Sequence, residues 1–284
     1  MKKAGKLFIK GLIKSCIGVA LLLGVAAISY RLVFRLFHIS EETKEAVAEY
    51  AGEQEVLLKA SVDDISKHLI FCVDEEGEVI RLLLEVYHCA QRRMCYFTIP
   101  TDTRITMSDS LYQKVMLVNP SVPQMMKLSG ITKSLPEESA YEYGVLLIEE
   151  LLNIKMSYYT IVPVGVYGTV FETEGAEEEA GAPAKDGGKV ERAYPREVFS
   201  KEFLTRVHNF QIEEDVNHYL EEMYEEIDSN LSLVDKRNYI DSYLKLTSGD
   251  ISFEVIAGEK TNSAYLIDNS LAAEQLARIT GQAD

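Results

Sequence analysis

The sequence predicts an α/β domain with a mixed central sheet and helices on both faces, preceded by one N-terminal transmembrane helix. Short apolar runs typical of strands alternate with amphipathic helical stretches from residue 65 onward. Between residues 94 and 166 a strand, a helix and another strand follow one another, which indicates a crossover unit. With 284 residues, 47% of them hydrophobic, the chain can bury a sizeable core in one or two domains.

The first 36 residues have the pattern of a membrane anchor. Residues 1–14, the basic tail, contain five lysines and no acidic residue. Residues 15–36 are almost entirely uncharged and approach the length of about 20 residues that crosses a bilayer. Lysines before the span orient the N-terminus toward the cytoplasm. Val25 and Ala27 could also form the cleavage site of a signal peptide, and this alternative stays open.

The charge of the rest of the chain limits the class of partner. The total charge is −16, so the residues after the five lysines of the tail carry −21. Such an acidic surface repels nucleic-acid phosphates, and we expect no nucleic-acid partner. Residues 37–64 are polar and helical in character, which predicts a stalk between the membrane and an extracellular domain at residues 65–284.

Strand patterns dominate the first half of this domain. We expect strands at residues 68–73, 79–88 and 94–99, with the last two joined as a hairpin by residues 89–93. A helix follows over residues 138–152, after a capping pattern that begins at Ser134.

The second half alternates strands, helices and one acidic segment. We expect a strand at 155–166 and then a mobile acidic loop at 171–191, which has almost nothing to bury. The remaining patterns predict helices at 198–228, 235–246 and 270–280 and a strand at 251–256.

Several common chemistries have no basis in the sequence. It contains no GxSxG, P-loop or HExxH motif, and its five histidines are scattered. Cys89 and Cys95 flank the expected hairpin turn and could form a disulfide, or they could be buried thiols.

The segment from Thr98 to Arg104 (T-I-P-T-D-T-R) is the strongest candidate site. A proline ends the strand, so the next residues lie at the edge of the sheet, where α/β folds bind ligands. There Asp102 could act as a base or metal ligand and Arg104 as a phosphate clamp. The alternative is a solvated turn in which Asp102 caps backbone amides.

These motifs resemble those of the LytR–CpsA–Psr family of Gram-positive bacteria. Thr98 to Thr103 (T-I-P-T-D-T) are similar to the family's S-I-P-R-D-T, and Leu69 to Asp74 (L-I-F-C-V-D) to its L-L-L-G-x-D. Glu78 to Leu84 are similar to D-T-I-M-L-V-S, and Leu151 to Thr160 to the family's helix, link and strand. The resemblance covers Leu69 to Phe171 well and the C-terminal part less closely.

The resemblance implies a membrane-anchored protein of the cell envelope that binds a polyprenyl-pyrophosphate-linked glycan and transfers the glycopolymer to peptidoglycan. By position, Asp74 and Glu78 would hold Mg²⁺ against the pyrophosphate. Asp102 and Arg104 would be the catalytic residues, and Arg104 and Thr101 would contact the pyrophosphate. An active protein would therefore be a phosphotransferase-type glycopolymer transferase.

The sequence departs from the family at the residues that would bind phosphate. Thr101 replaces the arginine of the hallmark motif, and no hydroxyl reproduces a bidentate guanidinium. The family's later arginine pair has no clear match, because the acidic segment lies where it would occur. We therefore also consider a non-catalytic scaffold or regulator of cell-wall assembly, tethered to the cytoplasmic membrane.

The anchor makes a testable prediction about topology. In intact cells, external protease should digest the C-terminal domain, because the lysines of the tail keep the N-terminus inside. Immunoblotting with an antibody against the C-terminal domain measures this. A domain that resists protease until the membrane is permeabilised would contradict the predicted orientation.

Overall fold

The computed structural model describes residues 58–136, 139–171 and 212–281, which belong to one compact unit. The expected basic tail, the span at 15–36, most of the stalk and the acidic loop after residue 171 lie outside the described residues. None of the described helices combines the length and the apolar character needed to cross a bilayer.

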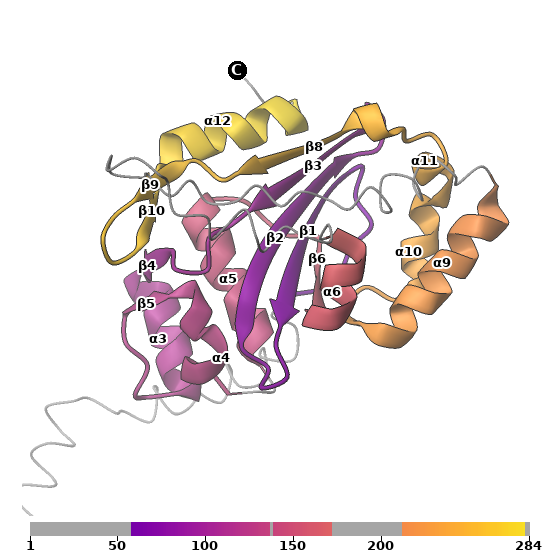
Figure 1. Ribbon diagram of the computed structural model, residues 1–284. Coiled ribbons are helices and arrows are strands. Elements are labelled where there is room, and N and C mark those ends of the chain that lie inside the picture. The colour runs from indigo at the N-terminus through magenta and orange to yellow at the C-terminus, as the bar shows by residue number, and fades with distance from the viewer. Residues whose placement is uncertain (1–57, 137–138, 172–211, 282–284) are drawn as a thin grey trace, which may run out of the picture. The chain divides into compact units, whose positions relative to one another are not determined.

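A six-stranded mixed sheet forms the centre of the domain (Figure 1), in the order β7-β6-β1-β2-β3-β8. The strands of this sheet are β1 (Ile65–Val73), β2 (Val79–His88), β3 (Arg93–Thr98), β6 (Tyr158–Pro163), β7 (Asp228–Ser229) and β8 (Ile251–Val255). The antiparallel meander β1-β2-β3 lies in the middle, and β6 and β8 run parallel to β1 and β3. The carboxyl ends of β1, β3, β6 and β8 therefore lie at one edge of the sheet.

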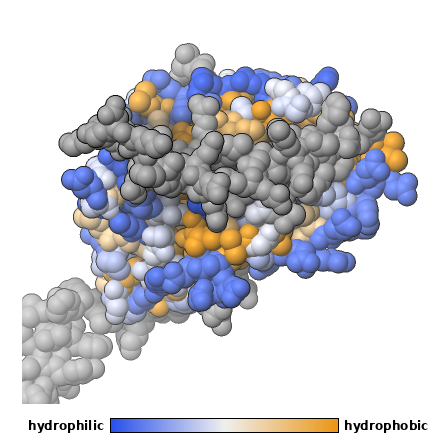
Figure 2. Space-filling model, viewed as in Figure 1, coloured by the Kyte–Doolittle hydropathy of each residue, from blue (hydrophilic) through white to orange (hydrophobic). Residues whose placement is uncertain are grey.

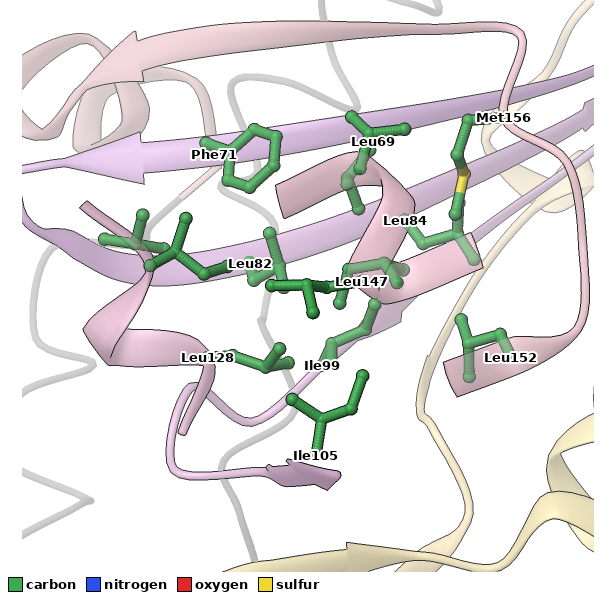
Figure 3. Close-up of a cluster of buried hydrophobic side chains, with 14 of the residues drawn as sticks. Leu69, Phe71, Leu82, Leu84, Ile99, Ile105, Leu128, Leu147, Leu152 and Met156 are labelled. Atoms are coloured by element: carbon green, nitrogen blue, oxygen red, sulfur yellow. The ribbon is translucent and has the colours of Figure 1, made fainter. Parts of the chain in front are cut away.

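The central strands bury both of their faces, which explains their nearly continuous apolar sequences. In β1, Leu69 and Phe71 belong to one core, whereas Ile70 and Cys72 belong to the core on the other side. Figure 3 shows the first core, in which side chains from β1 and β2 meet Leu147 and Leu152.

Helices cover both faces, as expected. The first core contains residues of α3 (Asp109–Val118), α4 (Ile131–Ser134), α5 (Ala140–Leu152) and α12 (Asn269–Thr280). The second core contains residues of α6 (Val164–Phe171) and of the segment around η3 (Arg237–Tyr239), and α9 (Glu213–Glu226) packs beside it on α11 (Ile240–Tyr243). Figure 2 shows an apolar area near the middle of the visible face, and hydrophilic residues where α9 lies at its right margin.

Most of the expected elements are present. The strands expected at 68–73, 79–88, 94–99 and 251–256 and the last helix are confirmed to within a few residues, and β2 and β3 form the expected hairpin. The helix expected at 138–152 is α5, which begins at Ala140.

Two expectations differ from the structure, and one open alternative is decided by it. The strand expected at 155–166 ends at Pro163, which has no N–H for a continuing ladder, and Val164 begins α6. The helix expected at 235–246 consists of three short pieces, α10 (Leu233–Lys236), η3 and α11. Cys89 and Cys95 are free thiols, since Cys95 pairs with Val86 within the sheet and the disulfide considered above does not form.

Short elements that the sequence patterns do not predict complete the carboxyl edge. They are the ribbon of β4 (Arg104–Thr106) and β5 (Met125–Lys127), the turn η2 (Leu128–Gly130) and the hairpin of β9 (Gly258–Lys260) and β10 (Tyr265–Ile267). The turn η4 (Ser248–Asp250), which the sequence patterns also do not predict, lies at the opposite edge, where β8 begins.

The close packing of the β9–β10 hairpin predicts a large effect for Gly258→Ala. A Cβ atom at Gly258 would lie 2.3 Å from the backbone oxygen of Leu266, so the hairpin would have to open. We expect a loss of about 2 kcal/mol or more in the free energy of unfolding, measured with denaturant. Gly165→Ala, in α6 with open space around it, is the matched control and should change stability by about 1 kcal/mol or less. Equal effects of the two substitutions would contradict this account.

Candidate functional site at the carboxyl edge of the sheet

The predicted site residues lie in two loops at the same edge of the sheet. Asp74 and Glu78 belong to the turn between β1 and β2, and Thr101, Asp102 and Arg104 follow β3. Thr98, the last residue of β3, pairs with Leu83, four residues after β2 begins at Val79, so the turn between β1 and β2 extends about 13 Å beyond the end of β3. The two loops therefore leave the same edge of the sheet at different heights.

Asp74 and Glu78 are held by contacts within and beside their turn. Asp74 Oδ1 accepts hydrogen bonds from the backbone N–H groups of Glu76 (3.1 Å) and Glu78 (2.8 Å), and Gly77 takes the positive φ that closes the turn. Glu78 Oε1 forms a salt bridge of 2.7 Å with Lys133 Nζ. Asp74 therefore has a structural role in capping the turn.

Backbone contacts fix the loop that follows β3. The carbonyl of Thr101 accepts a hydrogen bond from Ser129 N–H (2.7 Å), and that of Thr103 accepts one from Leu128 N–H (3.0 Å). Asp102 accepts from Tyr265 N–H through its carbonyl (3.2 Å) and forms an ion pair with Lys260 through its carboxylate. The loop is thus a rigid support for the residues around it.

Lys260 is a component of the site that sequence reasoning missed. It comes from β9, more than 150 residues after Asp102, and it brings a cation to the loop whose hallmark arginine is replaced by Thr101. The only signal in the sequence is a lysine shortly after the strand at 251–255, which has no meaning until the β9–β10 hairpin is seen beside the loop.

Arg104 and Lys127 form a cross-strand pair of like charges. They are direct partners in the β4–β5 ribbon, and both side chains are exposed. The Cβ atoms of directly opposed residues lie about 5 Å apart, and like charges at that distance destabilise a ribbon. Neither residue forms an ion pair with any of the described acidic residues. An anion bound between the two side chains would relieve their repulsion.

The resemblance implies a Mg²⁺ site at Asp74 and Glu78, and the carboxylates at this edge can be compared with what Mg²⁺ requires. Within the described ranges, no three His, Cys, Asp or Glu residues lie close enough to form an all-protein metal site. Mg²⁺ usually takes only one or two carboxylates and completes its shell with water and substrate phosphates. Asp74 Oδ2 and Glu78 Oε2, which make no contact with the described residues, fit that smaller requirement.

An apolar cavity lies on the face of the sheet that α6 and α9 cover. Its volume is about 160 Å³, close to that of a core cavity of about 150 Å³ that binds benzene. None of the residues Thr101 to Arg104 lines it. It therefore encloses a small molecule or a short stretch of a longer chain, and it does not open beside Asp102.

Charged side chains form part of the wall of this cavity. His68 Nδ1 lies 3.4 Å from Glu85 Oε1, His68 Nε2 lies 2.7 Å from the hydroxyl of Thr160, and the His68 ring stacks on Tyr158 at 4.2 Å. Lys236 Nζ donates a hydrogen bond of 2.6 Å to the hydroxyl of Tyr158. All three ionisable residues are buried.

Burial and pairing shift the pKa values of this group. Burial lowers the pKa of His68 below 6.5, although Glu85 opposes that shift, and burial also lowers the pKa of Lys236. For Glu85, burial would raise the pKa, but the hydrogen bond from His68 and the charge of Lys236 outweigh it and lower the pKa to about 2. At neutral pH the cavity wall therefore holds the Glu85 carboxylate beside an imidazole and an amine whose pKa values are both lowered by burial.

The buried imidazole predicts how stability depends on pH. The folded pKa of His68 is lower than its unfolded value of 6.5, so below pH 6.5 the unfolded chain binds more protons. The free energy of unfolding should therefore decrease as the pH is lowered below 6.5, by up to about 1.4 kcal/mol per pH unit, until the pH reaches the folded pKa. Glu85, with a folded pKa of about 2, contributes only below about pH 4.5. Denaturant unfolding between pH 5 and 7 measures the slope.

The matched variants are His68→Gln and His218→Gln. His218 is an exposed residue of α9 that lies 3.2 Å from Glu222. His68→Gln should flatten the pH dependence, and His218→Gln should preserve it. An unchanged slope in His68→Gln would show that another group is responsible.

Comparison with known proteins places the fold. No protein-family model and no curated protein matches the chain. Its structure is similar to that of a candidate transcription regulator from Eubacterium siraeum (TM-score 0.52, 10% identity, covering 81% of this chain and 96% of that one). It is also similar to the protein gbs0355 from Streptococcus agalactiae (TM-score 0.51, 13% identity, covering 77% and 87%). These two scores show a shared fold.

A further match is YwtF (TagT), named as a LytR-CPS2A-psr family protein, in complex with octaprenyl pyrophosphate (TM-score 0.45, 14% identity, covering 80% of this chain and 95% of that one). The low identities are those of a divergent sequence. The chain therefore shares the fold of the first two structures at the identity of a divergent sequence.

Proposed function

We propose that this protein is a divergent member of the LytR–CpsA–Psr family that binds the pyrophosphate of a polyprenyl-linked glycan at the carboxyl edge of its sheet. The like-charged pair of Arg104 and Lys127 carries the proposal, because two opposed exposed cations favour an anion between them. The fold and the order of the motifs from Leu69 to Phe171 support the same assignment.

Each residue at this edge would make a different contact with the pyrophosphate. Arg104 would donate two parallel hydrogen bonds from its guanidinium, and Lys127 would act as a point charge. Asp102 would position Lys260 beside the phosphates, and Thr101 would add a hydroxyl donor. Together these cations supply charge that the hallmark arginine supplies in the family.

Mg²⁺ is part of the proposal. Asp74 and Glu78 would hold the ion through the oxygens that their turn leaves available, and bound phosphates would complete its shell. The ion would stabilise the negative charge that develops on the lipid phosphate as it leaves when the P–O–P bond breaks. Glu78 would keep Lys133 at Oε1 and offer Oε2 to the ion, and the phosphates of the lipid would complete the site.

The replacement of the hallmark arginine by Thr101 favours weak or absent transfer of the glycan to peptidoglycan. A protein that binds the lipid-linked glycan without transferring it would serve as a scaffold or regulator of cell-wall assembly, and this is the alternative function. In both cases we propose a single-pass protein of the cytoplasmic membrane whose C-terminal domain is extracellular.

The edge site predicts the effect of four substitutions on lipid binding. We would titrate the detergent-solubilised full chain with octaprenyl pyrophosphate by calorimetry, with Mg²⁺ or with chelator. Arg104→Ala and Lys127→Ala should each weaken binding by about 1.5–3 kcal/mol, the scale of a charge-assisted hydrogen bond. Lys245→Ala, which removes an exposed lysine far from the edge in sequence, is the matched control and should have no effect. Thr101→Arg should strengthen binding.

The scaffold alternative without a lipid site predicts a different pattern. Binding would then be absent or insensitive to Mg²⁺, and Thr101→Arg would be inert or slightly destabilising. If neither the wild type nor Thr101→Arg binds the lipid, the pyrophosphate site has to be abandoned and only the similarity in fold remains.

A further inference from the structure

Lys236 is a buried lysine that the edge site does not use. Only 9% of the residue is exposed, and from the end of α10 it lines the apolar cavity together with Tyr158 and Tyr243. Its Nζ atom lies 4.8 Å from the centre of the Tyr158 ring and 5.3 Å from that of the Tyr243 ring. The amine nitrogen therefore lies beside the cavity and away from bulk water.

The contacts of the amine leave its nitrogen able to react. Nζ donates a hydrogen bond of 2.6 Å to the hydroxyl of Tyr158, and among the described residues the side chain makes no other hydrogen bond and no ion pair. A neutral amine that donates through one N–H keeps its lone pair for attack on an electrophile. The geometry around Lys236 is therefore compatible with a nucleophile.

The surroundings favour the neutral amine more than water does. Burial lowers the pKa of Lys236, and the negative charge of Glu85 opposes this shift without reversing it. A lysine that is desolvated in an apolar pocket is a common form of the amine that condenses with carbonyl compounds in enzymes. Lys245, which is exposed, lacks this desolvation and serves as the reference below.

The size of the cavity limits the compound that could reach the amine. The cavity volume is about 160 Å³, and a core cavity of about 150 Å³ binds benzene. Apart from its polar residues, the lining is mostly apolar and includes Val162, Val170, Leu220 and Met223. A carbonyl compound with one ring or a short branched chain therefore matches this space, whereas a sugar or a long chain does not.

We propose that Lys236 is a nucleophilic amine that forms an imine with a small apolar aldehyde bound in the cavity. The lone pair of Nζ attacks the carbonyl carbon, and both hydrogens of the neutral amine leave with the carbonyl oxygen as one water molecule. A carbon–nitrogen double bond replaces the carbon–oxygen double bond, so the step needs no oxidant or reductant. The hydroxyl of Tyr158, which is bonded to Nζ, is placed to pass protons from the nitrogen to the oxygen.

This site is separate from the proposed pyrophosphate site. None of the residues Thr101 to Arg104 lines the cavity, and the reaction at Lys236 requires no phosphate and no metal ion. Each proposal can therefore fail without the other.

The test is reductive trapping of the imine with benzaldehyde and sodium cyanoborohydride, on the full chain in detergent. The reductant converts an imine into a stable benzylamine, and peptide mass spectrometry gives the labelling rate of each lysine. At pH 7.5 Lys236 should be labelled at least about tenfold faster than Lys245, because the cavity holds the aldehyde beside its nitrogen. Saturating toluene, which fills the same space without reacting, should slow the labelling of Lys236 and leave that of Lys245 unchanged.

Biphenyl-4-carbaldehyde is the matched control for size. It carries the same reactive group on two rings, which are too large for a cavity that is close in volume to one that binds a single benzene. Its labelling should therefore show no preference for Lys236 over Lys245. A preference as large as that of benzaldehyde would contradict the assignment to this cavity.

The variant Glu85→Gln tests the environment of the amine. Glutamine keeps the shape of the side chain and an oxygen that can accept the hydrogen bond from His68, but it removes the charge that raises the pKa of Lys236. The labelling of Lys236 should therefore reach half of its maximal rate at a lower pH than in the wild type, and the profile of Lys245 should stay the same. If this variant does not fold, the probes on the wild type still decide the question.

Two results on the wild type would overturn the proposal. Labelling of Lys236 by benzaldehyde that is no faster than that of Lys245 would show that the cavity does not bring an aldehyde to the amine. Labelling of Lys236 that toluene does not slow would show that the reaction takes place outside the cavity. Binding of octaprenyl pyrophosphate at the carboxyl edge would remain possible in both cases, because calorimetry measures it separately.

Discussion

The parallel pairing of β1 with β6 and of β3 with β8 is the constraint on which the rest of the structure depends. It brings the carboxyl ends of four strands to one edge, so the turn after β1 and the loop after β3 lie at the same edge although they are separated by a complete strand. The pairing is specific because both faces of β1 are buried. A shift by one residue would exchange Leu69 and Phe71 with Ile70 and Cys72 and misfit both cores.

The two faces of the sheet differ in what they bury. The face under α5 and α12 is filled almost entirely by hydrocarbon, as Figure 3 shows for Leu82, Leu84 and Leu147, and it serves stability. The opposite face buries His68, Glu85 and Lys236 beside a cavity. Buried charges contribute little to stability compared with apolar residues of the same size, so packing alone does not account for this group.

The sequence predicted the central strands because their apolar runs and flanking turn residues are local signals. β2 and the closing helix were predicted to within one residue, and Asp74, Glu78, Asp102 and Arg104 do lie at one edge of the sheet. The parts that were missed depend on partners far away in the chain. The residues from Val164 onward are rich in valine, as strands are, yet they form α6. The β4–β5 ribbon forms only because residues 125–127 pair with residues 104–106.

Lys260 is a part of the candidate site that local sequence patterns could not predict, because its partner lies far away in the chain. Residue 101 is a threonine where the similar motif has an arginine, which suggests from the sequence alone that the loop lacks a cation. The structure supplies the cation from β9, through the ion pair with Asp102, and a second from β5, where Lys127 faces Arg104. Positive charge at this edge is therefore set by three segments that are remote in sequence. A lysine held in this way offers a point charge rather than a planar fork, so it favours binding of a phosphate over the precise alignment that transfer of a phosphoryl group requires. This difference is the physical reason to expect that binding of the lipid survives in this chain better than catalysis.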